Sequence, residues 1–178
     1  MARLVDSYYT SERLGTALCF GLALVILSVG IYLVKTRIGF SNGLGWALLL
    51  GSVLILVASG TYFIGLGDNH AKYAKLLATD APQFFAQETD HMVQAVRSFR
   101  WVILGEIGIA LAGIGLIILG QVRGTQGLSG IGVGIALVAL VLAFYDSLNR
   151  ERAIIYRQTL QAALTPGTES PPIDHQEH

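Results

Sequence analysis

Four long apolar runs divide this chain of 178 residues and leave little sequence for anything else. The first, second and fourth runs contain no charged residue, and the third contains one acid, Glu106. A helix rises about 1.5 Å per residue, so about 20 apolar residues cover the roughly 30 Å hydrocarbon core of a bilayer. The sequence therefore predicts an all-α polytopic membrane protein, a bundle of four transmembrane helices at residues 14–34, 44–66, 101–120 and 128–145.

The composition and charge balance narrow the classes of partner. Charged residues make up 13% of the chain, against about 25% in a typical soluble domain. Basic and acidic residues number 12 each, so there is no basic excess with which to hold a nucleic acid. We therefore expect membrane lipids and other transmembrane helices as partners, and no nucleic acid. The single cysteine, Cys19, cannot form a disulfide within the chain.

Helical patterning continues beyond the second span. The stripe recurs at intervals of three and four, on one helix face, and consists of Leu66, His70, Tyr73 and Leu77. Asp80 can cap a new helix, because Pro82 suits a first turn and Gln83 follows the cap by three residues. No helix-breaking residue separates that third helix from its span, so the helix is expected to be about 40 residues long. Its apolar stripe includes Phe85. We expect helices two, three and four to extend into a cytoplasmic helical stalk.

The remaining segments are assigned from their turn signals. Residues 1–13 form a short polar amino-terminal segment, in which Ser11 is positioned to cap the first helix. The bundle with its hairpin (about 68–100) and its carboxy-terminal helix extension covers 14–164. Turn-forming residues predict loops at 41–43 and 121–129. The tail 165–178, which contains His175 and His178, is expected to be disordered.

Basic residues beside the spans predict the orientation. The amino-terminal segment, the hairpin and the carboxy-terminal extension hold nine lysines and arginines, whereas the other two loops hold three. Because cytoplasmic loops carry the basic excess, both termini and the hairpin are expected in the cytoplasm, with the protein in a bacterial-type plasma (inner) membrane.

An internal repeat is visible at an offset of 87 positions. Arg13 corresponds to Arg100, Gly43 to Gly130, and residues 21–24 (GLAL) to residues 108–111 (GIAL). A duplicated two-helix unit would place a pseudo-twofold axis along the membrane normal. Chance self-similarity of a sequence rich in glycine and leucine is the alternative.

Small residues mark helix-packing faces, because helices in lipid associate where small side chains let their backbones approach. These faces pack the four helices of one chain against one another, or they dock a second copy or a larger membrane complex. The candidate packing residues are Gly105, Gly108, Ala112, Gly113, Gly130 and Gly134.

Glu106 is the candidate ion- or proton-binding residue. An acid within a span is costly, and by default it indicates a functional site. The apolar runs hold no lysine, arginine, histidine or second acid to pair with it, so Ser59, Thr61 or another subunit is the expected partner. A structural hydrogen bond is the alternative role.

Two further groups of residues suggest weaker sites. His70 and His91 fall in one layer of the predicted hairpin and could hold a transition metal, although two ligands do not complete a site. Basic residues where the helices leave the membrane could hold anionic lipid headgroups, namely Arg97, Arg100, Arg150 and Arg152.

No motif for phosphate binding, a nucleophilic serine or a catalytic metal is present in the sequence, so neither an enzyme nor a cofactor is predicted. The leading functional hypothesis is a non-enzymatic membrane protein that acts through helix-mediated assembly, as an accessory subunit or a homo-oligomer. The alternatives are a small ion or proton channel or transporter that uses Glu106, and a metal- or redox-linked protein that uses the two histidines.

Overall fold

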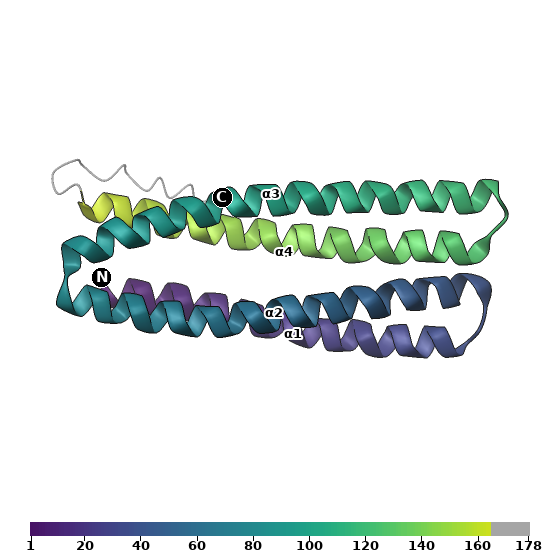
Figure 1. The fold of residues 1–178 in the computed structure, drawn as a ribbon, viewed down its shortest axis with the longest axis horizontal. Helices are drawn as coiled ribbons and strands as arrows, with labels where there is room; N and C mark the ends of the chain where they lie inside the picture. The colour runs from purple at the N-terminus through teal and green to yellow at the C-terminus, as the bar shows by residue number, and fades with distance from the viewer. Residues whose placement is uncertain (165–178) are drawn as a thin grey trace, which may run out of the picture.

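The computed structural model of the chain describes residues 1–164, which form four helices joined by short turns. Each helix is long and apolar enough to cross a membrane. The prediction of an all-α chain with four membrane-length helices is therefore confirmed. The predicted tail 165–178 lies outside the described residues. In chain order the helices are α1 (Ala2–Lys35), α2 (Gly39–Thr79), α3 (Ala81–Val122) and α4 (Gln126–Leu164) (Figure 1).

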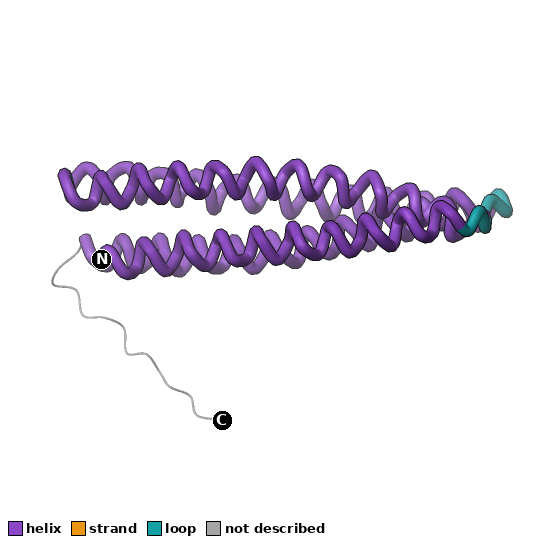
Figure 2. Tube along the Cα trace, turned by 90° about the horizontal axis from the view of Figure 1, so that it is seen from below, coloured by secondary structure: helices purple, strands orange, loops and turns teal. Residues whose placement is uncertain are grey.

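The helices form two antiparallel hairpins, α1–α2 and α3–α4, which lie side by side along their length (Figure 1). The two short loops inside the hairpins sit together at one end (Figure 2), which we call the loop end. In the most apolar 18-residue stretch of each helix, 39% of α4 and 28% of α2 is buried inside the protein. The corresponding share is 11% for both α1 and α3. α2 and α4 therefore form the central pair, while α1 and α3 present most of their apolar surface outward, as helices in lipid do.

The turn between the hairpins, at the opposite or Asp80 end, forms as predicted. The Asp80 carboxyl accepts a hydrogen bond from the backbone N–H of Gln83 at 3.0 Å, and Pro82 lies in the first turn of α3. α3 is 42 residues long, in agreement with the expected length. The buried stripe of its first turns is shifted by one residue, because Phe84 is fully buried whereas Phe85 is half-buried.

The first helix and the loops differ from the predictions. α1 begins at Ala2, so Ser11 lies inside a helix and all four helices extend beyond the spans. Val5, Tyr9 and Glu12 are buried at intervals of three and four, and the two polar members concealed this stripe from a search for apolar periodicity. The first loop lies at 36–38 instead of 41–43, and the second, at 123–125, is shorter than the predicted 121–129. Gly43 packs closely on Gly127, so the first turns of α2 and α4 are in contact.

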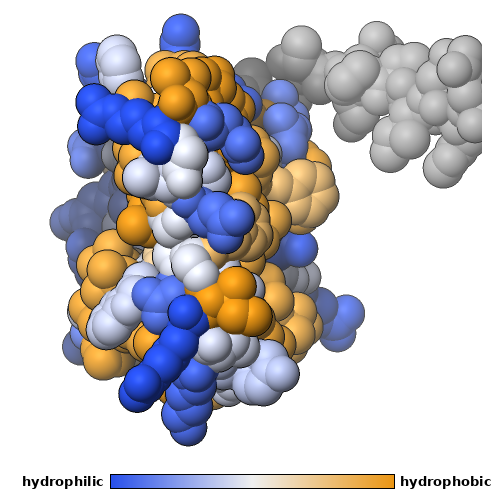
Figure 3. All heavy atoms as spheres, turned by 90° about the vertical axis from the view of Figure 1, so that its right-hand side faces the viewer, coloured by the Kyte–Doolittle hydropathy of each residue, from blue (hydrophilic) through white to orange (hydrophobic). Residues whose placement is uncertain are grey.

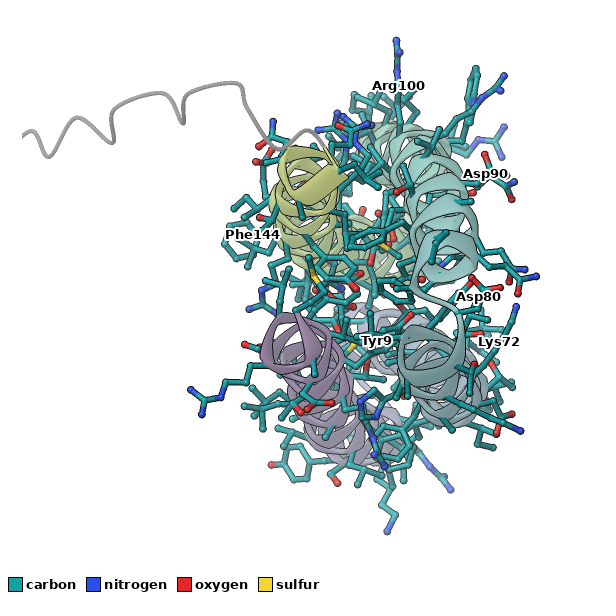
Figure 4. All side chains as sticks on the ribbon, turned by 90° about the vertical axis from the view of Figure 1, so that its left-hand side faces the viewer. Tyr9, Lys72, Asp80, Asp90, Arg100 and Phe144 are labelled. Atoms are coloured by element: carbon teal, nitrogen blue, oxygen red, sulfur yellow. The ribbon has the colours of Figure 1, made fainter. Side chains whose placement is uncertain are left out.

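The largest hydrophobic core lies in the ends of the helices that meet near Asp80, and all four helices contribute to it. Figure 4 shows Tyr9 between the helices there, with Lys72, Asp90 and Arg100 on the outside. Seen from the loop end, hydrophilic residues gather on the end face and hydrophobic surface flanks them (Figure 3). The core contains Val5, Tyr9, Leu66, Tyr73, Phe84, Met92, Tyr156 and Leu160.

The two hairpins repeat one another at the offset of 87 positions. α1 and α3 end at Lys35 and Val122, and the starts of α2 and α4 differ by the same number. The residues with positive φ in the two loops are also equivalent, Arg37 at 56° and Gly124 at 65°. The two loops therefore adopt the same left-handed turn, which favours duplication over chance self-similarity.

Equivalent positions of the two hairpins also meet each other where α2 packs on α4. A Cβ atom at Gly134 would lie 2.6 Å from the Cβ of Ala47, the residue 87 positions earlier. Gly51 and Val138 have the same offset, and a Cβ at Gly51 would lie 3.1 Å from Val138 Cγ1. A residue that contacts its own equivalent must lie beside the axis relating the two units. The α2–α4 interface thus contains a pseudo-twofold axis along the helices.

Candidate functional site

A groove of about 710 Å³ runs along the bundle between α2 and α3, with α4 also lining it. Leu54 and Ile109 on its two rims are exposed, whereas Ile55 and Ala139 beneath them are buried. The groove is therefore open sideways, toward the lipid around a membrane-embedded bundle. Most of its lining is apolar, and its polar side chains gather at the end nearer Asp80: Thr16, Cys19, Ser59, Tyr62, Glu106, Tyr145, Asp146 and Asn149.

Two acids from adjacent helices meet at this polar end. Glu106 on α3 is 9% exposed, and its carboxyl group is within hydrogen-bonding reach of that of Asp146 on α4. Oε2 of Glu106 is buried, and no donor in the described chain makes a hydrogen bond to it. Like charges so close in an apolar environment cannot both be ionised at low cost. The arrangement therefore favours one proton shared between the two carboxyl groups.

In the described chain, neither of the two hydroxyls expected to pair with Glu106 donates a hydrogen bond to it. Ser59 lines the groove, but its hydroxyl donates to the Ile55 carbonyl of its own helix at 2.6 Å. Thr61 donates to carbonyls of its own helix and is exposed. Asp146 was overlooked because it directly follows the last apolar residue of the fourth run. Asp146 lies only one residue beyond that run on α4. It is therefore at the same depth in the bundle as Glu106 when α3 and α4 pack together.

The side chains at the polar end of the groove come from equivalent positions of the two hairpins, but the residue types at these positions differ. Glu106 corresponds to Cys19, and Asp146 corresponds to Ser59, at the offset of 87. All four side chains line the same groove. The α1–α2 hairpin thus supplies a thiol and a hydroxyl, and the α3–α4 hairpin supplies both acids.

A further acid, Glu12, is fully buried and lies just outside the first predicted span. It is 1% exposed and accepts a hydrogen bond from the Tyr62 hydroxyl at 3.2 Å. Burial raises the pKa of the Glu12 carboxyl, and the Tyr62 hydroxyl and the Arg152 guanidinium oppose that rise. Asp146 raises it further by charge repulsion, so Glu12 is electrostatically connected to the acids of the groove.

A second fully buried acid, Glu88, joins three helices near the Asp80 end. It has no exposed surface, and its Oε1 accepts hydrogen bonds from Tyr9 on α1 at 3.2 Å and Tyr156 on α4 at 3.1 Å. Its Oε2 lies 3.4 Å from His91 Nδ1. Burial and then the Glu88 carboxyl raise the pKa of both tyrosines, so both remain protonated donors.

A second cavity, of about 570 Å³, connects these two regions. Tyr9 and His91 line it at one end, and Tyr62 and Asp146 line both this cavity and the groove. Acids and tyrosines thus follow one another from the groove toward the Asp80 end. Sequence reasoning missed Glu12 and Glu88, although both continue a helical stripe of buried residues: Glu12 follows Val5 and Tyr9, and Glu88 lies between Phe84 and Met92.

The two histidines have separate carboxyl partners. His70 Nε2 lies 2.9 Å from Asp6 Oδ1 and stacks on Tyr9, whereas His91 pairs with Glu88 and stacks on Tyr73. Within residues 1–164, no group of three or more histidine, cysteine or acidic side chains could hold a metal ion.

The predicted packing residues divide into two sets. Gly113, Gly130 and Gly134 lie in contacts between helices of this chain, where an added Cβ would collide with a neighbour. Gly105 and Gly108 are exposed on α3 with nothing within 4 Å of an added Cβ, and Ala112 is exposed beside them.

The four basic residues proposed to hold lipid headgroups lie at the surface. Arg97, Arg100 and Arg152 are exposed, and Arg150 is half-buried with Glu151 at 3.8 Å. Arg152 also reaches inward, since its Nη1 would lie 3.2 Å from a Cβ atom at Gly15, one helical turn along α1 from Glu12.

Comparison of the chain with models of protein families, with curated proteins and with solved structures found no match.

Proposed function

We propose that this chain is a small, non-enzymatic membrane protein that binds and releases protons at Glu106 and Asp146, as part of a proton-linked carrier. The observation that carries the proposal is the unpartnered Oε2 of Glu106 beside a second acid at the end of an open groove. Structural polar groups in a buried site are normally satisfied, because an unpaired one costs about 1–3 kcal/mol. Two acids placed together with one oxygen unpaired are a poor way to fix a helix contact and a suitable way to hold an exchangeable proton.

The route by which protons reach the pair is the row of acids and tyrosines toward the Asp80 end. Asp146 interacts with Glu12, and Tyr62 links Glu12 to the second cavity. Two partners of Glu88, Tyr9 and His91, line that cavity. Toward the loop end, the described lining of the groove has no ionisable side chain. Protons therefore exchange with one side of the membrane only, and the groove connects the pair to the lipid. This combination suits a carrier better than an open channel.

The orientation belongs to the same proposal. The basic residues gather beside the Asp80 end, which we place in the cytoplasm of a bacterial-type cell by the positive-inside rule. The acids then exchange protons with the cytoplasm.

Infrared difference spectra of the protein in nanodiscs, recorded across a pH titration, test proton binding directly. We expect a protonated-carboxyl band that titrates in the parent protein and is lost or shifted in Glu106→Gln and Asp146→Asn. Glu151→Gln, which changes an exposed acid on the same helix as Asp146, serves as the control and should leave the band unchanged. In proteoliposomes with an imposed pH gradient, the first two substitutions should reduce proton movement. A titrating band that is identical in all variants would refute the proposal.

Helix-mediated assembly is a second candidate function, which the outer face of α3 favours. Gly105, Gly108 and Ala112 share this face and pack on nothing in the described chain. Such small residues let a second helix approach closely in lipid. Gly108→Leu should weaken self-association or partner binding, measured by crosslinking and native mass spectrometry in nanodiscs. Gly21→Leu is the matched control, because Gly21 is exposed at the equivalent position of the first hairpin. A monomer without partners in the parent protein would exclude this function.

A further inference from the structure

The groove has the dimensions of a site for one slender amphiphile. Its volume of about 710 Å³ falls in the range of about 300–1,000 Å³ typical of small-molecule sites. Along α4, the lining from Ile131 to the acidic residue Asp146 spans about 22 Å at about 1.5 Å per residue. Its side is open between the rims on α2 and α3, so a membrane-dissolved molecule can enter from the lipid without crossing an aqueous phase.

The charge at the polar end selects the headgroup. The charged group that acts on Glu106 within the described chain is another acid, Asp146, and Oε2 of Glu106 has no donor. A cation with hydrogen-bond donors would satisfy that oxygen and reduce the repulsion between the two carboxyl groups. The long apolar lining requires the rest of the molecule to be apolar.

We propose that the groove binds a lipophilic amine, with its ammonium group at Glu106 and Asp146 and its hydrocarbon chain along α4 toward Trp46. This inference rests on the proposed proton-binding role of the same two acids. An anionic phospholipid would bring its phosphate beside two carboxyl groups. An apolar helix from a second copy would cover the groove and leave Glu106 Oε2 without a donor.

Binding of the amine and of the shared proton are mutually exclusive. The ammonium group stabilises both carboxylates, so its arrival releases the proton and its affinity falls as the pH falls. Other titratable groups face the pair from the neighbouring helices and belong to the same equilibrium: Cys19 and Glu12 on α1, Tyr62 on α2, and Tyr145 on α4. Arg152 is the cation that acts on Glu12.

The test uses the full chain in nanodiscs of neutral lipid, with decylammonium as the probe. Trp46 lines the groove and is one of the two tryptophans, so Trp101→Phe leaves its fluorescence as the reporter. We expect saturable binding of decylammonium at mildly alkaline pH and weaker binding at mildly acidic pH. Glu106→Gln should lower the affinity at least about tenfold, since a charge-assisted hydrogen bond contributes roughly 1.5–3 kcal/mol. Glu151→Gln, the exposed-acid control, should bind as the parent does.

Two further measurements make the outcome decisive. Decanol has the same chain with a neutral head and should bind at least about tenfold more weakly, for the same reason. Ala58→Phe fills the groove at an exposed lining residue and should abolish the fluorescence change without altering the core. Equal binding of decanol and decylammonium, or equal binding to the parent and Glu106→Gln, would overturn the assignment. If amine binding fails but the infrared band still titrates and depends on Glu106, only the assignment of a lipophilic amine as the ligand is refuted. If the band is also independent of Glu106, the proposed proton-binding role is refuted as well.

Discussion

Replacing the buried acid Glu88 by leucine tests whether it stabilises the junction of three helices. The leucine side chain is of similar size, so the main loss is that of the acceptor for Tyr9 and Tyr156. These two residues are 1% and 3% exposed, so water does not readily replace the carboxyl group. Each buried hydroxyl left unpaired costs about 1–3 kcal/mol, so Glu88→Leu should destabilise the fold by about 2–6 kcal/mol in total.

The same reasoning predicts a rescue. A protein with Glu88→Leu, Tyr9→Phe and Tyr156→Phe together removes both donors along with the acceptor, and replacing all partners by apolar groups is nearly neutral. We therefore expect the triple variant to recover most of the lost stability, whereas the single substitution does not. Asp90→Leu, on the exposed face of the same helix, is the control and should change the stability little.

Reversible unfolding in mixed micelles with increasing dodecyl sulfate, followed by circular dichroism, gives the free energy of unfolding for each variant. The reasoning is refuted if Glu88→Leu is as stable as the parent protein, because the two tyrosine hydrogen bonds would then contribute nothing. It is also refuted if the triple variant is as unstable as the single one. His91 loses its carboxyl partner in the single and the triple variant alike, so this loss cancels when the two variants are compared.

Three further predictions concern the loops, a helix contact and pH. Arg37→Gly should raise and Gly124→Ala should lower the free energy of unfolding in micelles, each by about 1 kcal/mol, because both positions have positive φ. Gly113→Ala should destabilise by about 1–3 kcal/mol in the same assay, since its Cβ would lie 2.8 Å from a backbone oxygen of α4, whereas Gly108→Ala should not. Burial raises the pKa of Glu12 above that of the unfolded chain, so the native state binds its proton more tightly. The melting temperature should accordingly rise as the pH falls from the folded to the unfolded pKa of Glu12, and Glu12→Gln should flatten that dependence.

The sequence predicted those features that depend on runs of one residue class or on local turn chemistry. Four apolar stretches defined four helices, and the cap at Asp80 with its partner Gln83 defined the turn between the hairpins. The start of α1 was missed because its buried stripe includes Tyr9 and Glu12, which an apolar pattern does not count. The acid facing Glu106 was missed for a related reason. Asp146 lies beyond the edge of an apolar run, and only the pairing of α3 with α4 brings it to the groove.

The repeat of the two hairpins accounts for the position of the candidate site. Where equivalent positions meet at the pseudo-twofold axis, a duplicated chain begins with identical residues on both sides of the interior. Two acids on each side would place four carboxyl groups in one apolar space, at a cost that rises with every added charge. In this chain the equivalents of Glu106 and Asp146 are Cys19 and Ser59, which are neutral and small. The backbone thus keeps the symmetry that close α2–α4 packing requires, while the side chains confine the acidic pair to one hairpin. The groove therefore has one end that selects for charge and is otherwise apolar.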